Sequence, residues 1–362
     1  MIIYPNFSLR AHNSFQLNVS ARYFAEYYSV QELVELLSSD LLKENRFLQI
    51  GGGCNLLFIN DFDGVILHSG IKGIEFISED DKFIRVRVGA GEVWDNFVQF
   101  AVEQNFGGIE NLSHIPSEVG AAPIQNIGAY GAEAKNVIEA VETIEIATGK
   151  KRVFSNEECH FGYRNSVFKH ELKDKYIVIY VVFKFEKQPQ LLLNYGNLRE
   201  EVLKRGKPSI KTVREAVIAI RQSKLPDHKT IGNAGSFFMN PVISIEKLDE
   251  LKTLYPDIPS YALSAKNPFS PLREEGKDKP LLLHNNTSEG EVEVKIPAAW
   301  LIEQCGWKGK SLGNAAVHDK QALVLINKGN ATGVEIMHLA TEITKSVEAK
   351  FGIKILLEII VV

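Results

Sequence analysis

Residues 115–133 read IPSEVGAAPIQNIGAYGAE, a stretch crowded with small residues and amides and poor in charge. Such a composition gives a ligand access to the backbone, and it suits a flat polar heterocycle with a diphosphate tail. The alternative is an ordered connection that packs on a sheet and binds nothing. The length favours function, because long loops in compact domains are usually functional or disordered, and the apolar residues argue against disorder.

A second glycine-rich motif, IGGGCNLLF, covers residues 50–58. Three glycines between two apolar segments permit positive φ angles and let a ligand approach the bare backbone. The amide groups of such a turn can bind a phosphate. The spacing is not G-x-G-x-x-G, and an extended segment follows instead of a helix, so a Rossmann site is not indicated. A glycine-rich hairpin without a ligand remains the alternative.

The segments around these motifs alternate between strand and helix patterns. Ser29 and Glu32 form a predicted capping box, and so do Thr212 and Glu215. The predicted strands cover 47–50, 54–58, 64–68, 83–88, 137–147, 176–185 and 355–362. One predicted helix follows each capping box, and the second of these ends at Leu225 before Pro226. Two other predicted helices cover 91–105 and about 333–350, and one more begins at Pro297. A polar, proline-containing segment at 265–290 predicts a surface loop. The mixture predicts an α+β fold.

The composition narrows the possible functions. Of 362 residues, 45% are hydrophobic and 24% are charged, which is typical of a soluble globular protein. The formal net charge of −4, without a basic tract, argues against a nucleic-acid partner. Cys54, Cys159 and Cys305 form no CxxC motif, so neither a disulfide framework nor a metal site is expected. The first residues lack a signal-peptide pattern, and the apolar run at 176–183 is too short for a membrane span, so we expect a cytoplasmic protein without a membrane partner.

Ser236 lies in the stretch GNAGSFFMNP, residues 232–241. A hydrolase nucleophile usually occupies a G-x-S-x-G elbow, and here two phenylalanines follow the serine directly. Donating a proton to a carbon acid is a different task, which needs only the right position. The motif therefore favours a proton donor over a nucleophile.

Three other polar residues attract attention for their surroundings. Arg164, in FGYRNSVFK, either binds a carboxylate or packs on Tyr163 as a structural arginine. Glu358 is the odd residue of ILLEIIVV and either faces a cleft or points from an edge strand into solvent. Lys224 precedes the Ser236 motif and Asn240 ends it, a pairing that suits a phosphorylated or carboxylate-bearing substrate.

Taken together, these segments resemble the UDP-N-acetylenolpyruvoylglucosamine reductases of bacterial cell-wall synthesis. The resemblance is carried, in the family's order, by IGGGCNLLF, IPSEVGAAPIQNIGAYGAE, FGYRNSVFK, LLNYGNL, KLPD, GNAGSFFMNP, AAWLIEQCGWKG and AAVHDKQALVLIN. These stretches span nearly the whole chain. The segment LLNYGNL, with Tyr195, looks like the loop of the family's type I form.

The resemblance implies an α+β flavoenzyme. It implies a two-subdomain FAD-binding fold of the vanillyl-alcohol-oxidase or PCMH type, followed by a C-terminal α+β substrate-binding domain. The expected ranges are 1–70 for the first FAD-binding subdomain, joined by a C-terminal strand at about 352–362, then 71–225 for the second and 226–351 for the substrate domain. It further implies that NADPH reduces FAD, and that the flavin hydride then converts the enolpyruvyl ether of UDP-N-acetylglucosamine into a D-lactyl ether. We expect a monomer.

The resemblance also assigns roles to single residues. Arg164 would bind the substrate carboxylate, Glu358 would assist there, and Ser236 would deliver the proton. The residues expected to bind the substrate are Tyr130, Tyr195, Lys224, Asn240 and Gln304. The residues expected to bind FAD are Gly51, Gly52, Gly53, Cys54, Asn55, Leu56, Pro116, Ser117, Gly120, Ala121, Gln125, Asn126, Gly128, Ala129, Tyr130 and Gly131.

The chain departs from the family's pattern in three places. The terminal motif usually reads like P-E-V-R-x-I, but here it is Leu357-Glu358-Ile359-Ile360, which lacks the proline and the arginine. Asn13-Ser14-Phe15 stands where N-T-F is usual, and Cys54 stands where serine is common. A thiol near FAD raises the alternative of a covalently bound flavin.

Three other functions are compatible with parts of the sequence. They are a serine hydrolase that uses Ser236, an FAD-dependent oxidase of the same fold acting on a sugar or alcohol, and a nucleotide-binding module without catalysis. Each of them requires several independent motifs to coincide by chance, so the reductase is favoured.

Overall fold

The computed structural model describes residues 1–264, 267–271 and 293–362, which form two compact units. The first unit comprises residues 1–14, 18–54 and 60–224, and the second comprises 15–17, 55–59 and 225–362. The division into three domains with the ranges given above stays a prediction. No helix of the described residues is long and apolar enough to cross a membrane.

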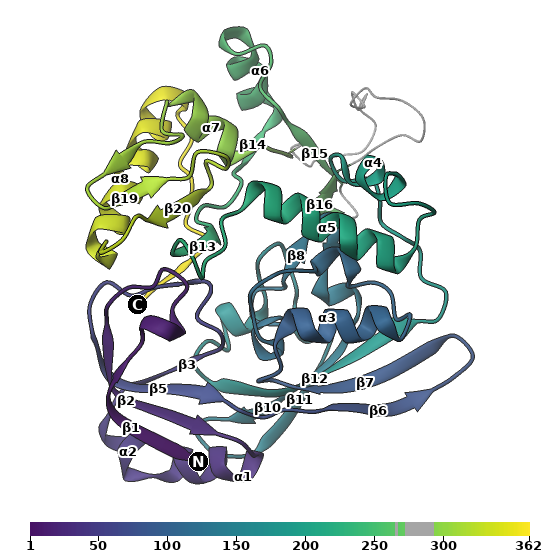
Figure 1. Cartoon of the computed structure of the whole chain (residues 1–362), viewed down its shortest axis with the longest axis vertical. Helices are drawn as coiled ribbons and strands as arrows, with labels where there is room; N and C mark the ends of the chain where they lie inside the picture. Colours follow the sequence, from purple (N-terminus) through teal and green to yellow (C-terminus); the bar gives the residue numbers. More distant parts are fainter. Residues whose placement is uncertain (265–266, 272–292) are drawn as a thin grey trace. The chain divides into compact units, whose positions relative to one another are not determined.

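The first unit begins with a four-stranded sheet of order β1-β2-β5-β3 (Figure 1). Its strands are β1 (Ile2–Ser8), β2 (Ser20–Tyr27), β5 (Phe62–Ser69) and β3 (Phe47–Ile50). The pairs β2–β5 and β5–β3 are parallel. The helices α1 (Val30–Ser38) and α2 (Asp40–Glu44) bury Leu33, Leu36 and Leu42 in the same core as Val65 and Leu67 of β5.

The predicted capping box at the start of α1 is half formed. The Ser29 hydroxyl accepts the Glu32 backbone N–H at 3.1 Å, as expected. The Glu32 carboxylate, however, accepts the N–H of Tyr28 at 2.7 Å instead of that of Ser29. One side chain therefore caps the helix, and the other ties down the residue before it.

The second sheet of the first unit has five antiparallel strands in the order β11-β10-β12-β7-β6. They are β11 (Lys151–Ser155), β10 (Ile138–Glu145), β12 (Tyr176–Glu186), β7 (Phe83–Gly89) and β6 (Ile74–Glu79). Helix α3 (Trp94–Glu103) lies on this sheet and buries Phe97 beside Phe183 of β12, with ring centroids 4.7 Å apart (Figure 1). The loop at 107–131 follows α3 and packs into the same core through Val119 and Ile127.

The first unit also contains several short elements. They are the 3-10 turns η1 (Arg10–His12), η2 (Glu110–Leu112), η3 (Val119–Ala121), η4 (Ala134–Asn136) and η5 (Val167–Lys169), and the small hairpin of β8 (Gly128–Ala129) and β9 (Ala132–Glu133). Local turns therefore order much of the loop at 107–131.

The helices α4 (Leu198–Leu203) and α5 (Ile210–Lys224) complete the first unit. The prediction that Thr212 caps α5 is wrong. The helix starts at Ile210, and the Ser209 hydroxyl accepts the Thr212 N–H at 3.1 Å, because a serine was available three residues earlier. The predicted end before Pro226 is confirmed.

In the part of the chain that the structure describes, the second unit contains two four-stranded sheets and a two-stranded one. The first sheet has the order β13 (Asn233–Ser236), β20 (Val324–Asn327), β19 (Ala315–Val317) and β18 (Ser311–Leu312). The second has the order β14 (Val242–Ser244), β17 (Glu293–Lys295), β15 (Tyr261–Ser264) and β16 (Asn267–Pro271). The third pairs β21 (Ile360–Val361) with β4 (Leu56–Leu57) in parallel. The helices are α6 (Ile245–Leu254), α7 (Ala298–Gln304) and α8 (Gly333–Phe351).

Several predictions for the second unit can be compared with these elements. Helix α7 begins at Ala298, one residue after the predicted start at Pro297, and α8 covers the predicted range with a full capping box between Thr332 and Glu335. The predicted strand at 355–362 is wrong for most of its length, since only Ile360–Val361 form a strand, with a single bridge at Leu357. The predicted surface loop at 265–290 lies mostly outside the described residues, and 267–271 within it form β16.

Candidate active site

The glycine turn after β3 is built by close backbone packing. Gly53 has φ +65°, and a Cβ at this position would lie 1.9 Å from the carbonyl oxygen of His12. A Cβ on Gly51 would meet Glu118 Oε2 at 3.3 Å and Ala121 Cβ at 3.7 Å, so the turn lies against the 115–131 loop. A Cβ on Gly52 would meet only the Cys54 sulfur, at 3.5 Å. The turn is therefore crowded on the protein side and more open around Gly52, as a backbone that receives a ligand should be.

The loop carries the conformations that are typical of binding sites. Asn126 and Tyr130 have positive φ angles of 47° and 49°, which are uncommon for residues with a Cβ, and Gly131 has φ 83°. Gly120 lies so close to Ala90 that a Cβ would approach the alanine methyl to 2.8 Å. Such strained backbone tends to cluster at functional sites.

One buried hydroxyl beside the turn has no hydrogen-bond partner among the described residues. Ser14 is 4% exposed, its N–H donates to the carbonyl of Gly53 at 3.1 Å, and its Oγ is unsatisfied. An unsatisfied buried polar atom needs an explanation, and a bound polar group is a common one. The close-packed turn, the strained loop and this hydroxyl together fit a ligand with a diphosphate, such as FAD.

Two residues expected to bind FAD have other partners in the structure. The Asn126 side chain is fully buried, donates to the Gly162 carbonyl at 2.9 Å and accepts the Lys135 N–H at 3.0 Å, so it holds the loop in shape. The Cys54 thiol donates to the Gly52 carbonyl at 3.1 Å. Burial, with a smaller effect of Glu118, raises the pKa of Cys54 to about 12. The thiol therefore stays protonated at neutral pH, which argues against a covalent bond to a flavin.

Arg164 comes after the 115–131 loop in the sequence and contacts it in the structure. It has φ +54°, and its Nη2 donates to the Gly128 carbonyl at 2.7 Å. Its guanidinium carbon lies 5.3 Å from the centroid of the Tyr163 ring. The backbone contact places this arginine against the β8–β9 hairpin, so the arginine is part of the loop's surroundings.

Tyr130 and Tyr195 meet in the same unit. Their ring centroids lie 5.7 Å apart at 74°, and Asn111 Nδ2 donates to the carbonyls of Tyr130 and Leu192, each at 2.8 Å. Burial raises the pKa of Tyr130, although the neighbouring Arg221 opposes that rise. The two predicted tyrosines are thus brought together from distant parts of the chain.

Arg221 belongs to this cluster and was not predicted from the sequence. It lies on α5, one turn before Lys224, and its Nε donates to the carbonyl of His114 at 3.1 Å. Burial, together with repulsion from Arg164, lowers its pKa, while Tyr130 and Asp95 oppose that effect. Arg221 therefore lies beside Tyr130 and near enough to Arg164 for the two guanidinium groups to repel each other. The one available signal was the segment RQSKLPD, in which only the lysine was singled out.

In the second unit, Ser236 and Glu358 lie on neighbouring backbone segments. Ser236 ends β13, after Gly235 with φ +68°, and is paired with Val324. The N–H of Glu358 donates to the carbonyl of Phe237 at 2.9 Å. The rings of Phe237 and Phe238 are fully buried, which explains the two aromatics after the serine as anchors of this segment. The backbone of Glu358 is therefore bonded to the residue that follows the predicted proton donor.

Asn240 and Gln304 lie at the two ends of α7. Asn240 Oδ1 accepts the N–H of Ala298 at 2.9 Å and so caps the helix, while Gln304 is its last residue and is exposed. Ile360 is exposed in β21, where the family's pattern has arginine. No group of three or more potential metal ligands occurs among the residues that the structure describes.

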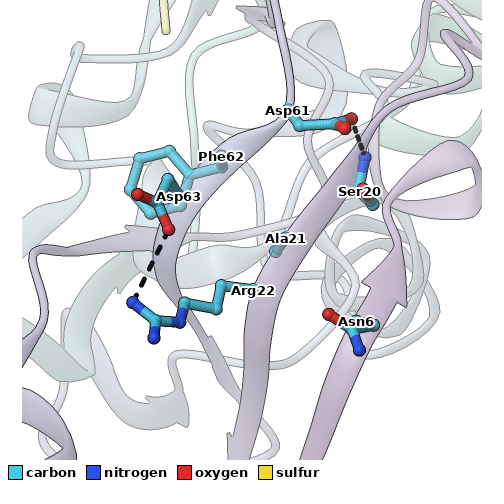
Figure 2. Close-up of a pocket in the computed structure, with 7 residues that line it drawn as sticks. All are labelled: Asn6, Ser20, Ala21, Arg22, Asp61, Phe62 and Asp63. Carbon is cyan, nitrogen blue, oxygen red and sulfur yellow. Dashed lines mark hydrogen bonds and ion pairs between the residues drawn. The ribbon is translucent and has the colours of Figure 1, made fainter.

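A pocket of about 250 Å³ elsewhere in the first unit contains none of the predicted site residues (Figure 2). It is lined by Asn6, Ser20, Ala21, Arg22, Asp61, Phe62 and Asp63. Asp61 accepts the Ser20 N–H at 2.7 Å, and Arg22 pairs with Asp63 at 3.7 Å. A smaller pocket of about 200 Å³ between α4 and α5 includes Lys224.

The class of the protein follows from the first unit. Residues 21–155 match the family model described as an FAD binding domain. This match places the chain among the FAD-binding proteins. Residues 226–362 match the model described as the C-terminal domain of UDP-N-acetylenolpyruvoylglucosamine reductase.

Full-length relatives identify the family. The chain is 46% identical to the UDP-N-acetylenolpyruvoylglucosamine reductase of Bacteroides fragilis over 96% of this chain and 97% of that protein. It is 42% identical to the protein of the same description from Flavobacterium johnsoniae, over the full length of both. The chain belongs to the UDP-N-acetylenolpyruvoylglucosamine reductase family, as the sequence motifs indicated.

A solved structure confirms the fold class. The crystal structure of UDP-N-acetylenolpyruvylglucosamine reductase from Thermus caldophilus matches with a TM-score of 0.65, covering 100% of this chain and 99% of that chain. At 22% identity this likeness speaks for the fold alone. The predicted α+β architecture, with a two-subdomain FAD-binding fold and a C-terminal α+β domain, is thereby confirmed.

Proposed function

We propose that this chain reduces the enolpyruvyl ether of UDP-N-acetylglucosamine to the D-lactyl ether, with NADPH as the reductant and FAD as the cofactor. Membership of the reductase family supports the reaction. The observation that carries the assignment of residues is the hydrogen bond that holds Glu358 beside the strand of Ser236.

The glycine turn and the 115–131 loop would hold the FAD. Gly51, Gly52 and Gly53 offer backbone to the diphosphate, and the unsatisfied hydroxyl of Ser14 lies beside them. The other loop residues named above surround the flavin by the same proposal. When bound, FAD accepts a hydride from NADPH and supplies it to the vinyl carbon of the substrate.

Arg164 would bind the substrate carboxylate. Addition of a hydride to the terminal vinyl carbon leaves negative charge on the carbon that bears the carboxylate. A guanidinium beside that carboxylate stabilises the charge as it develops, and electrostatic stabilisation of this kind is usually the largest catalytic contribution. Glu358 would assist at the same group.

Ser236 would complete the reaction by donating its hydroxyl proton to the carbon that bears the carboxylate. The new C–H bond neutralises the charge, and the serine oxygen then regains a proton from solvent. A general acid needs a fixed position, which the buried rings of Phe237 and Phe238 give to this segment.

Tyr130, Tyr195, Lys224, Asn240 and Gln304 would bind the uridine diphosphate and sugar. The tyrosine pair with its neighbouring arginines supports an anionic group in the first unit. We further propose that the protein works as a monomer in the cytoplasm, in the synthesis of peptidoglycan precursors on which cell shape and division depend.

A product analysis tests this proposal. The protein is incubated with NADPH and UDP-N-acetylglucosamine enolpyruvate, and the product mass is measured. We expect NADPH oxidation that depends on the substrate and a product that has gained two hydrogen atoms. UDP-N-acetylglucosamine, which lacks the vinyl group, serves as the control and should cause no NADPH oxidation. Oxygen consumption with a sugar alone, without use of NADPH, would instead support an oxidase.

A further inference from the structure

A partly buried charge network lies beside the glycine turn. His68, on β5, has Nδ1 at 2.9 Å from Glu26 Oε1 and Nε2 at 2.9 Å from Glu118 Oε1. The three side chains are only 15%, 22% and 12% exposed. A neutral imidazole has a single N–H and can donate to one of these carboxylates, whereas an imidazolium donates to both. The geometry therefore requires a positive charge on His68 when both glutamates are ionised.

Glu118 connects this network to the predicted cofactor site. Its Oε2 lies against Gly51, where a Cβ would approach it to 3.3 Å. Glu118 itself belongs to the 115–131 loop. The backbone N–H groups of the next two residues, Val119 and Gly120, donate to the carbonyls of Glu92 and Ala90, each at 2.8 Å. A single carboxylate thus touches both segments that are proposed to hold the FAD.

The charge balance of this place matters for an anionic ligand. With His68 protonated, the three side chains carry a net charge of about −1, and with His68 neutral the net charge is about −2. A diphosphate that binds to the nearby turn is repelled more strongly in the second case, because the network is shielded from water.

The other titratable groups near this network do not replace the charge of His68. The His12 ring, on η1, lies 5.7 Å from the His68 ring, and burial together with the charge of His68 lowers the pKa of His12. In the glycine turn, Cys54 stays a thiol because burial and Glu118 raise its pKa. Tyr27, next to Glu26 on β2, has a pKa raised by burial. Burial also disfavours the charged form of His68, but the hydrogen bonds and charges of Glu118 and Glu26 outweigh it and raise the pKa of His68.

We propose that protonated His68 is a positioning residue for FAD, which holds Glu118 and through it the glycine turn and the 115–131 loop in the binding arrangement. The inference rests on the proposed assignment of these two segments to FAD. Its consequence is that the affinity for FAD falls as the pH rises through the pKa of His68. This sign follows because the group is protonated in the form that binds the cofactor more tightly.

The release of FAD from the purified holoenzyme tests this inference. After dilution, the recovery of flavin fluorescence gives the release rate from about pH 6 to about pH 9, and we expect the rate to rise about tenfold over this range. In His68→Gln, which is neutral at every pH, release should be fast and independent of pH. The exposed His338 on α8 provides the control, and His338→Gln should keep the wild-type dependence.

Glu118→Gln is the sharper variant, because it acts in the opposite direction. An amide can donate to a neutral imidazole, and it removes one negative charge next to the turn. Release from Glu118→Gln at about pH 9 should therefore be slower than from the wild type, about tenfold, with the pH dependence lost. This variant also carries the test if His68→Gln does not fold.

The outcomes separate this inference from the proposed function. A wild-type rate that does not change with pH, or a Glu118→Gln variant with the wild-type dependence, would overturn the role of His68 while FAD binding stands. A wild-type protein that retains no FAD at any pH would overturn the proposed function itself.

Discussion

The two units hold their proposed functional groups in different ways. In the first unit, the cofactor segments are shaped by backbone: glycines at close approaches, residues with positive φ and carbonyls that accept hydrogen bonds. In the second unit, Ser236 and Glu358 are side chains on paired segments, anchored by buried phenylalanines. We therefore expect a change in the first unit to affect first the retention of flavin, whereas a change in the second should affect the chemistry and leave the flavin bound.

Removing the Ser236 hydroxyl should give the largest effect. It tests whether a change in the second unit affects the chemistry and leaves the flavin bound. In Ser236→Ala, we expect the oxidation of the reduced flavin by substrate to slow by about 10²–10⁴-fold, the contribution of a general acid. Reduction of the flavin by NADPH should be unchanged, and so should the flavin content. Stopped-flow absorbance measures the two half-reactions separately. Ser346→Ala on α8, which loses a hydroxyl bonded to a helix carbonyl, is the matched control. A normal rate of flavin oxidation in Ser236→Ala would exclude the serine as proton donor.

Substitution of Arg164 tests whether a side chain in the first unit can also affect the chemistry while the flavin stays bound. Arg164→Lys keeps a positive charge but loses the planar fork that binds a carboxylate with two hydrogen bonds. We expect the same half-reaction to slow by about 10²–10³-fold with the flavin retained. The exposed Arg152→Lys, in the same unit, should have no effect. If Arg164→Lys instead loses flavin while the half-reaction keeps its wild-type rate, the arginine acts by supporting the loop through the Gly128 carbonyl.

Substitution of Gly53 tests whether a change in the first unit affects the retention of flavin. In Gly53→Ala, the new methyl group would have to displace the His12 carbonyl from 1.9 Å in a conformation that already disfavours a side chain. Backbone strain of about 1–3 kcal/mol predicts a loss of FAD affinity of about tenfold or more. Absorbance of the purified protein measures the flavin content. Gly196→Ala, with φ +55° and open space around the Cβ, separates the strain from the collision. Equal flavin loss in both variants would contradict the role of close packing at the turn.

The smallest expected effect concerns stability in the first unit. Arg214 donates to both oxygens of Asp95, at 2.7 and 3.1 Å, and so ties α5 to α3. Burial alone would raise the pKa of Asp95, but Arg214 and the His114 N–H outweigh it and hold that pKa below its ordinary value. The pair therefore stabilises the fold above about pH 4, and its contribution is lost as the pH falls through the lowered pKa.

We expect Arg214→Met to lower the free energy of unfolding by about 1–2 kcal/mol at neutral pH. Urea unfolding at neutral pH and below about pH 4 measures the difference, which should shrink in acid. Lys43→Met removes an exposed ion pair with Asp40 and should change little. A difference that is the same at both pH values would show that Arg214 acts by packing.

The sequence predicted those parts of the molecule that depend on local patterns. The two glycine-rich segments, the end of α5 before a proline and the proline that opens α7 are local signals, and each lies where it was expected. The error at the start of α5 arose because two capping residues competed within three positions. The terminal strand was overestimated because buried apolar residues such as Ile353 and Ile355 pack without pairing into a sheet.

The remaining features depend on contacts between distant segments. No pattern around His68 indicates that Glu26 and Glu118 meet its two nitrogens, and Arg221 joins the tyrosine pair only after α5 has folded against the loop. The unsatisfied hydroxyl of Ser14 is likewise a property of the folded turn. Such contacts between distant segments require the structure.

The most direct test of the proposed reaction is an anaerobic visible spectrum of the purified protein, recorded before and after addition of NADPH and then of UDP-N-acetylglucosamine enolpyruvate. We predict a yellow flavin band that bleaches with NADPH and returns with the enolpyruvyl substrate. A flavin that bleaches but is reoxidised only by oxygen would contradict the proposed substrate. A colourless protein that cannot be reconstituted with FAD would contradict the whole proposed function.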